Sequence, residues 1–167
     1  MSRRIMNVNP IAGLSLLVVM FGCAGDRGSV EAEGLEVSKA YVAEPATGER
    51  TAMYLTITNS GDADDELLDV TTPAAGVAEI HRTYDDDGMM RMEPVSSMTI
   101  PAGTSVHLAP GGYHVMLMEL KEHLWAGDHV DVTLHFRHMG EVAVRPKVVA
   151  YSELETLLDT PQGHDAH

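Results

Sequence analysis

Cysteine is almost missing from this sequence: Cys23 is the one example among 167 residues. No intramolecular disulfide can therefore form, and no metal site built from several cysteine ligands is available. A chain of this length can bury enough apolar surface to fold without disulfides. We therefore expect one domain held together by a hydrophobic core.

Positive charge is also scarce. The chain has 11 Lys and Arg against 25 Asp and Glu, which gives a formal net charge of −14. Arg3 and Arg4 are the only charged residues among the first 22, so the remainder is more acidic still. Because such a surface repels a phosphate backbone, the charge argues against a nucleic acid partner.

Long apolar runs are limited to one segment near the N-terminus, over residues 11–21. With its positively charged start it has the outline of an export signal, and it is shorter than a membrane-spanning helix needs to be. Cys23 stands directly after this segment, as in the lipobox of bacterial lipoproteins, where the cysteine is lipidated and becomes the first mature residue. Met20 and Phe21 depart from the usual lipobox, so a plain secretory signal or an uncleaved anchor is the alternative.

These features predict a division of the chain into four parts. Residues 1–22 are the export signal, and 23–34 are a flexible tether that begins at the lipidated cysteine. Residues 35–150 are the folded domain, and 151–167 are a short polar tail, in which the part from Ser152 onward is expected to be a short helix or frayed. Whether the export signal is lipidated at Cys23, cleaved as a plain secretory signal or kept as an anchor, the domain is expected outside the cytoplasm. It would lie in the bacterial cell envelope and face the periplasm or the exterior.

Long amphipathic helices and internal repeats are missing as well. Short segments with alternating apolar residues, separated by turn signals, predict eight or nine strands and therefore an all-β antiparallel sandwich. Residues 131–137 show the clearest alternation, with Val132, Leu134 and Phe136 expected to face the core. The other expected strands are 35–42, 52–58, 67–71, 77–84, 89–94, 104–108, 113–120 and a last one through 142–148.

Several side chains between these strands have simpler interpretations. The sequence Asp87-Gly88 predicts a hairpin turn between the strands at 77–84 and 89–94. Trp125 is expected to be a packing anchor. The acidic cluster is expected to be a solvated loop, although carboxylates there could bind a hard cation; it consists of Asp62, Asp64, Asp65 and Glu66.

Histidine (9) and methionine (11) are numerous for this length, and both can bind metals. Four of them, His81, Met92, His114 and Met116, are separated by ten, twenty-one and one residues. Two imidazoles and two thioethers form a ligand set suited to Cu(I), and thioethers, unlike thiols, are not consumed by disulfide formation outside the cytoplasm. Because imidazole binds metal only when neutral, copper affinity should fall below a pH of about 6.5.

Spacing alone leaves the other interpretation open, because a single His or Met on a strand is more often a surface residue or a core filler. A blue copper electron carrier is excluded, since it needs a cysteine ligand and Cys23 belongs to the export region. A zinc hydrolase would need three His or carboxylate ligands and a general base, and no HExxH-type motif is visible. A metal-free adhesion or assembly module remains the main alternative.

The spacing of these four residues resembles the pattern of the periplasmic copper chaperone family called PCuAC. MRMEPV (90–95), IPAG (100–103) and LAPGGYHVMLMEL (108–120) are also similar to that family's characteristic segments. The similarity extends from about residue 35 to 149, nearly the whole expected domain.

The resemblance implies a cupredoxin-like, Greek-key β-sandwich and a chaperone, not an enzyme. The chaperone would bind Cu(I) through His81, Met92, His114 and Met116 and deliver it for assembly of the copper centres of cytochrome c oxidase. The partner would be an oxidase subunit or another copper-assembly protein, and the chain would be a monomer that touches the membrane through its lipid anchor alone.

Other His and Met residues are placed outside this site. Met90 and Met118 lie on the same strand faces as the expected ligands, where they either assist the site or pack beside it, and we expect packing for both. His164 and His167 in the tail are candidates for a weaker secondary Cu(II) site, with ordinary polar sequence as the alternative. The remaining five are expected to be surface residues: His107, His123, His129, His135 and His138.

Overall fold

The computed structural model describes residues 30–32 and 34–158. The expected export signal, Cys23 and the tail histidines His164 and His167 lie outside the described residues. Within these ranges, no helix has the length and apolarity needed to cross a membrane. The elements are β1 (Val30–Ala32), β2 (Leu35–Ala43), β3 (Arg50–Asn59), β4 (Asp65–Thr71), β5 (Ala75–Asp86), β6 (Met89–Pro94), β7 (Met98–Ile100), β8 (Thr104–Leu108), β9 (Tyr113–Leu120), β10 (Val132–Phe136), β11 (Gly140–Val144), β12 (Lys147–Val149) and α1 (Tyr151–Leu158).

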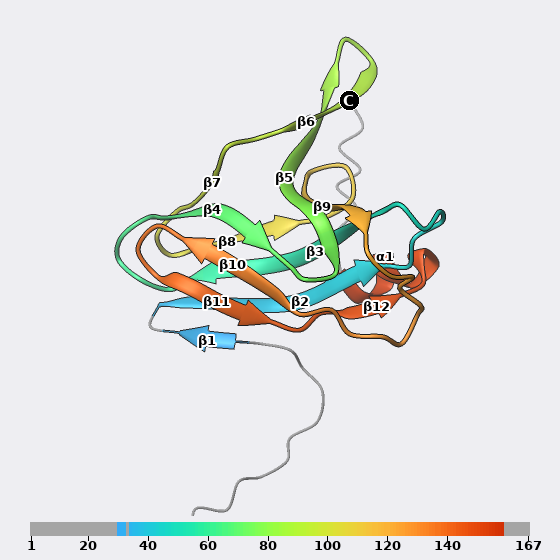
Figure 1. The fold of residues 1–167 in the computed structure, drawn as a ribbon. Helices are drawn as coiled ribbons and strands as arrows, with labels where there is room; N and C mark the ends of the chain where they lie inside the picture. The colour runs from blue at the N-terminus through green and yellow to red at the C-terminus, as the bar shows by residue number, and fades with distance from the viewer. Residues whose placement is uncertain (1–29, 33, 159–167) are drawn as a thin grey trace, which may run out of the picture.

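Two sheets form a sandwich, as the alternating sequence predicts (Figure 1). The larger sheet has the order β1-β2-β3-β9-β5-β6, with β12 also paired to β2 and β8 also paired to β3. The smaller sheet has the order β11-β10-β4-β7. All strand pairs are antiparallel except the one between β12 and β2.

The core lies between the sheets and is built by strand alternation. Val132, Leu134 and Phe136 of β10 are buried, which confirms the expected pattern. On β9 the odd-numbered Val115 and Leu117 belong to this core, so the even-numbered residues face the other side of the large sheet. The sequence left open which face of β9 is buried, and the core between the two sheets, which takes up Val115 and Leu117, decides it.

A second, smaller core lies on the other face of the large sheet. Helix α1 buries Leu154 and Leu158 against Tyr54 and Val149. Residues 151–158 are therefore a packed helix, which confirms the short helix that was one of the two alternatives for this segment. This small core borders the strands that carry the candidate metal ligands.

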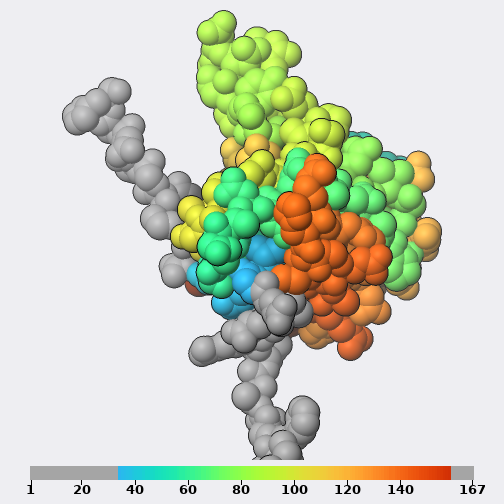
Figure 2. Space-filling view, turned by 90° about the vertical axis from the view of Figure 1, so that its left-hand side faces the viewer, coloured from blue at the N-terminus to red at the C-terminus, as the bar shows by residue number. Residues whose placement is uncertain are grey.

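Strand β5 is long enough to leave the sandwich. Its residues up to Arg82 pair with β9, and those from His81 onward pair with β6. We call residues 83–92 the hairpin arm, since they extend beyond the end of β9 and project from the body (Figures 1 and 2). At its tip Asp87 and Gly88 have φ values of 52° and 83°, which confirms the expected Asp-Gly turn.

The single last strand expected through 142–148 is wrong. Pro146 has no backbone N–H, so the ladder between β10 and β11 ends before it. The chain then crosses to the large sheet, where β12 pairs with β2. The short strands β1 and β7 also escaped sequence reasoning, because three residues carry too little periodicity to be recognised.

Two more expectations are corrected by burial. Trp125 is 61% exposed and stacks on His123 with ring centroids 3.8 Å apart, so it is not a packing anchor. Asp65 is buried, although the acidic cluster was expected to be a solvated loop. Burial alone would raise its pKa, but backbone N–H donors from Glu66, His138 and Met139 hold the pKa below the usual value.

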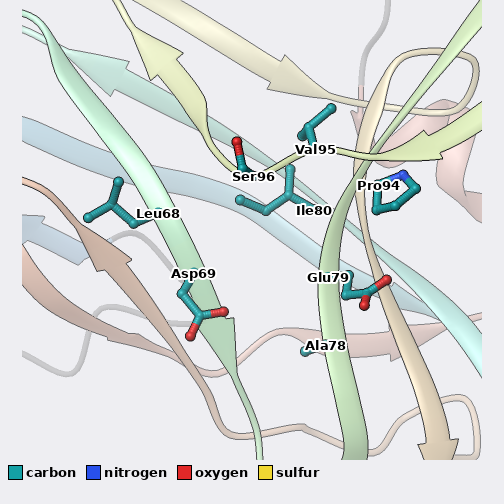
Figure 3. Close-up of a pocket in the computed structure, with 8 residues that line it drawn as sticks. All are labelled: Leu68, Asp69, Ala78, Glu79, Ile80, Pro94, Val95 and Ser96. Carbon is teal, nitrogen blue, oxygen red and sulfur yellow. The ribbon is translucent and has the colours of Figure 1, made fainter.

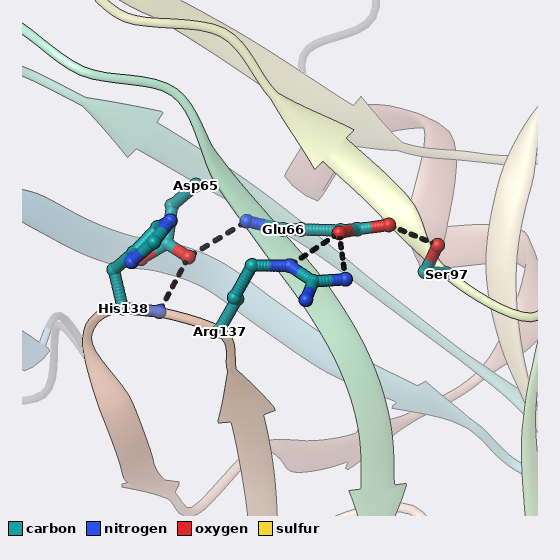
Figure 4. Close-up of polar contacts among 5 residues, drawn as sticks. All are labelled: Asp65, Glu66, Ser97, Arg137 and His138. Carbon is teal, nitrogen blue, oxygen red and sulfur yellow. Dashed lines mark hydrogen bonds and ion pairs between the residues drawn. The ribbon is translucent and has the colours of Figure 1, made fainter.

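The same corner ties β4 to the end of β10. Arg137 donates to the Glu66 carboxylate over 2.7 Å, and Ser97 donates to the other oxygen of that carboxylate (Figure 4). Both bonds lower the pKa of Glu66, and the bond from Ser97 has the larger effect. The acidic residues at the start of β4 therefore hold the small sheet in place rather than presenting free carboxylates.

Candidate metal centre

The two histidines of the expected ligand set lie side by side. His81 on β5 and His114 on β9 are direct cross-strand partners, and their rings are 5.9 Å apart at an angle of 46°. Both project from the face of the large sheet that is turned away from the main core. The sequence placed these residues on separate strands, and the structure brings them together.

Each ring is held by a group that can accept a hydrogen bond but cannot donate one. The Nε2–H of His81 donates to a carboxylate oxygen of Glu79 over 3.0 Å. The Nδ1–H of His114 donates to the backbone carbonyl of Gly112 over 3.1 Å. Since both acceptors fix the proton position, Nδ1 of His81 and Nε2 of His114 carry free lone pairs.

Those two nitrogens are buried and have no hydrogen-bond partner in the described structure. His114 itself is only 3% exposed. A buried acceptor without a partner costs free energy, about 1–3 kcal/mol, and calls for an explanation such as a bound ion. Two such lone pairs on facing rings are an arrangement that a metal ion would satisfy.

The surroundings keep His114 in its neutral form. Burial is the largest effect that lowers its pKa, and the neighbouring His81 lowers it further, while the bond to Gly112 opposes them. Tyr54 lies on the other side of His114, with ring centroids 6.3 Å apart. Burial, and then the charge of Tyr151, raise the pKa of Tyr54 to about 12, so its hydroxyl stays protonated.

The two thioethers lie on the same sheet face as the histidines. Met116 is half-buried and follows His114 by two positions on β9, where it pairs with Glu79. Met92 pairs with Thr83, one same-face step beyond His81, and is 55% exposed. Diagonal neighbours of this kind, about 7–8 Å apart, are within reach of long side chains. All four expected ligands therefore share one face of three adjacent strands.

The other His and Met residues divide differently from what the sequence suggested. Met90 is 64% exposed, so the expectation that it packs is wrong. Met118 is half-buried on the same face as Met116. Five histidines were expected at the surface. His135 is half-buried, and its ring is hydrogen-bonded to Thr71. The other four are exposed as expected: His107, His123, His129 and His138.

Beside the histidine pair, a cavity of about 370 Å³ lies between β4 and β5 (Figure 3). Ala78, Glu79 and Ile80 line it on β5, and Asp69 lines it on β4. Glu79, whose carboxylate orients His81, is thus also one of the residues that line this cavity. The cavity itself contains none of the expected metal ligands.

Sequence reasoning missed the groups that support the ligands. Glu79 could have been found, because it precedes His81 by two positions and must share its strand face. Tyr54 and the Gly112 carbonyl had no such signal, since their positions depend on strand pairing and loop geometry.

Oxygen and nitrogen ligands do not gather anywhere else in the described part of the chain. No group of three or more His, Cys, Asp or Glu side chains able to hold a metal ion occurs in residues 30–32 and 34–158. The three-ligand zinc site that a hydrolase would need is therefore not formed by these residues. Among the described residues, the facing histidines and the thioethers beside them are therefore the candidate metal site.

Comparisons with known proteins match the chain to a family of putative lipoproteins. A family model described as "Putative lipoprotein LpqE-like" matches residues 35–148. A protein of Leifsonia xyli subsp. xyli, named "Putative lipoprotein Lxx21020", is 36% identical over 140 residues, which cover 80% of this chain and 82% of that protein.

Solved structures with the same fold are PCuAC domains and a related protein. The apo PCuAC domain from PmoF1 is 29% identical with a TM-score of 0.63, over 73% of this chain and 98% of that domain. The Cu(I) form of DR1885 from Deinococcus radiodurans is 35% identical with a TM-score of 0.57, over 67% of this chain and 76% of that protein. The fold is thus the cupredoxin-like β-sandwich that the resemblance implied.

Proposed function

This chain belongs to the LpqE-like lipoprotein family, and from that premise we propose that it is a copper chaperone of the bacterial cell envelope. The observation that carries the proposal is the pair of facing histidines with buried, unpartnered nitrogens. Structures similar to this chain support it, since one of them is a Cu(I)-bound form.

We assign the copper ligands to Nδ1 of His81, Nε2 of His114 and the sulfurs of Met92 and Met116. Two thioethers favour a soft ion and disfavour Mg²⁺ and Ca²⁺, which prefer oxygen ligands. Zn²⁺ is bound by Cys, His and carboxylate ligands, so this set also selects against it. Cu(I) is the cargo that fits the four side chains.

The arrangement suits holding and releasing an ion rather than catalysis. His114 is buried and fixed, whereas Met92 is more than half exposed and lies on the projecting arm. A thioether forms a bond of moderate strength and has no proton to lose, so an incoming ligand can replace it without acid–base chemistry. We therefore expect ligand exchange to begin at Met92, and we expect no catalytic turnover.

The location and the recipient complete the proposal. A lipid on Cys23 would attach the domain to the membrane, with residues 24–29 as the spacer before β1, and the domain would work as a monomer. The recipient implied by the PCuAC resemblance is a copper centre of cytochrome c oxidase, reached directly or through another assembly protein. Copper transfer to a metal-free oxidase fragment would test that step separately.

A Cu(I) competition titration of the full-length chain in detergent tests the binding itself. We expect one Cu(I) per chain to be withdrawn from a colorimetric chelator, and both Met92→Ile and His114→Ala to weaken binding by at least tenfold. Met89→Ile and His107→Ala are matched controls, because both residues are exposed and lie outside the assigned site. If the parent chain cannot compete for Cu(I), the chaperone proposal fails, and the metal-free envelope module is favoured instead.

A further inference from the structure

The hairpin arm carries an unusual share of the exposed apolar surface. Six large hydrophobic side chains are exposed in the described part of the chain, and three of them are methionines on this arm. Met89, Met90 and Met92 are 59%, 64% and 55% exposed. Exposed apolar groups that cluster in this way mark an interaction or binding site more often than they occur by chance.

The two faces of the arm differ in chemistry. One face carries charged and aromatic groups that satisfy one another: Arg82 lies 5.1 Å from the Tyr84 ring, Tyr84 donates to Glu93, and Arg91 pairs with Asp86. Met89 is on this face, opposite Asp86. The charged face needs no further partner.

The other face continues the row of copper ligands. Met92 is opposite Thr83, and Met90, two positions nearer the tip, is opposite Asp85. Strand geometry separates these two methionines by about 6.8 Å along β6. Because methionine is long and unbranched, both sulfurs can reach a single ion between them.

We propose that Met90 and Met92 form a second, outer Cu(I) subsite at which copper arrives and from which it leaves. This inference rests on the proposed function, since Met92 also belongs to the inner site. The shared ligand allows stepwise exchange: the bond to Met90 is replaced by bonds to the histidines while Met92 stays attached. Copper remains Cu(I) throughout, so no electron acceptor or donor is required.

A negative charge near the tip of the arm also favours the approach of Cu(I) to Met90. Asp85 lies across from Met90 on the same face, and its carboxylate is held by the backbone N–H of Gly88 over 2.9 Å. A fixed negative charge beside an exposed thioether attracts a monovalent cation and raises its local concentration. Asp85 acts here as a positioning charge and not as a ligand.

Two substitutions on neighbouring residues test this subsite. Met90→Leu removes the sulfur but keeps the size and apolar character of the side chain. Met89→Leu makes the same change at similar exposure on the opposite face. In stopped-flow mixing of the Cu(I)-loaded full-length chain with excess bicinchoninate, we expect Met90→Leu to slow release about tenfold and Met89→Leu to change it less than twofold.

Methyl NMR of the methionines provides a second measurement, with Ag(I) as a redox-inert probe for Cu(I). The first equivalent should shift the methyl signals of Met92 and Met116, and the second should shift those of Met90 and Met92 and leave Met89 unchanged. Equal release rates for the two leucine variants, or a Met90 signal that never moves, would overturn the outer subsite. If the first equivalent leaves Met116 unmoved, the inner site and the proposed function fail instead.

Discussion

Glu79 determines which nitrogen of His81 faces the candidate metal position. Its carboxylate accepts the Nε2 proton, so the free lone pair of this ring lies on the buried Nδ1. Carboxylates in this position raise the basicity of a metal-binding imidazole and limit its rotation. Glu79 is therefore a positioning residue for copper rather than a ligand.

Loss of the Glu79 carboxylate should weaken copper binding without removing any ligand. We expect Glu79→Ala to lower Cu(I) affinity about 10- to 100-fold in chelator competition. Glu79→Gln should lose less, because its amide oxygen can still accept the Nε2 proton. Glu93→Ala, a carboxylate change on β6 at the opposite face of the large sheet, serves as the control. An affinity that Glu79→Ala leaves intact would mean that packing alone orients His81.

The lowered pKa of His114 gives the site a defined response to acid. A proton on Nε2 would compete with copper, and that proton binds only below the ordinary histidine value of about 6.5. In the metal-free chain, an NMR titration of the His114 ring should have its midpoint below that value. Folding stability should also decline as the pH falls from about 6.5 through the lowered pKa, since the unfolded chain takes up this proton first. A midpoint at or above 6.5 would contradict the buried, neutral ring.

The hairpin arm joins an exposed ligand to a fixed one. Residues 83–86 pair with β6 alone, and a two-stranded hairpin is only marginally stable by itself. His114 lies on β9, which the large sheet holds on both sides through β3 and β5. A copper ion bound by both Met92 and His114 would therefore fasten the arm to the body.

Hydrogen exchange can detect this fastening. We expect the arm amides at 83–86 and 89–92 to exchange faster than those of β9 in the metal-free chain, and to slow several-fold when Cu(I) is added. The hairpin formed by β10 and β11 lies outside the site and should not change. Arm amides that exchange equally fast with and without copper would place Met92 outside the coordination sphere.

Local patterns predicted some elements better than others. The Asp87-Gly88 turn and the shared face of His114 and Met116 follow from rules that act within a few residues, and both were predicted. The split at Pro146 was not, because tertiary packing decides it, and the sequence left open whether the residues after 151 form a short helix or a frayed tail. The register that places His81 opposite His114 is set by pairing between distant strands, and no sequence period reports it.

At the scale of the whole molecule, the sandwich separates stability from function. The main core lies between the sheets, and the candidate ligands lie on the opposite face of the larger sheet, beside the small core under α1. Copper could thus arrive and leave without disturbing the main core. The negative charge of the chain, −14 overall, favours a cationic cargo.

X-ray absorption spectroscopy of the Cu(I)-loaded full-length chain would detect the copper ligands themselves. We expect a Cu(I) edge with both nitrogen and sulfur neighbours, two of each, and about half the sulfur contribution in Met116→Ile. A spectrum with nitrogen and oxygen neighbours alone, or a sulfur contribution unchanged by that substitution, would contradict the assigned His/Met centre.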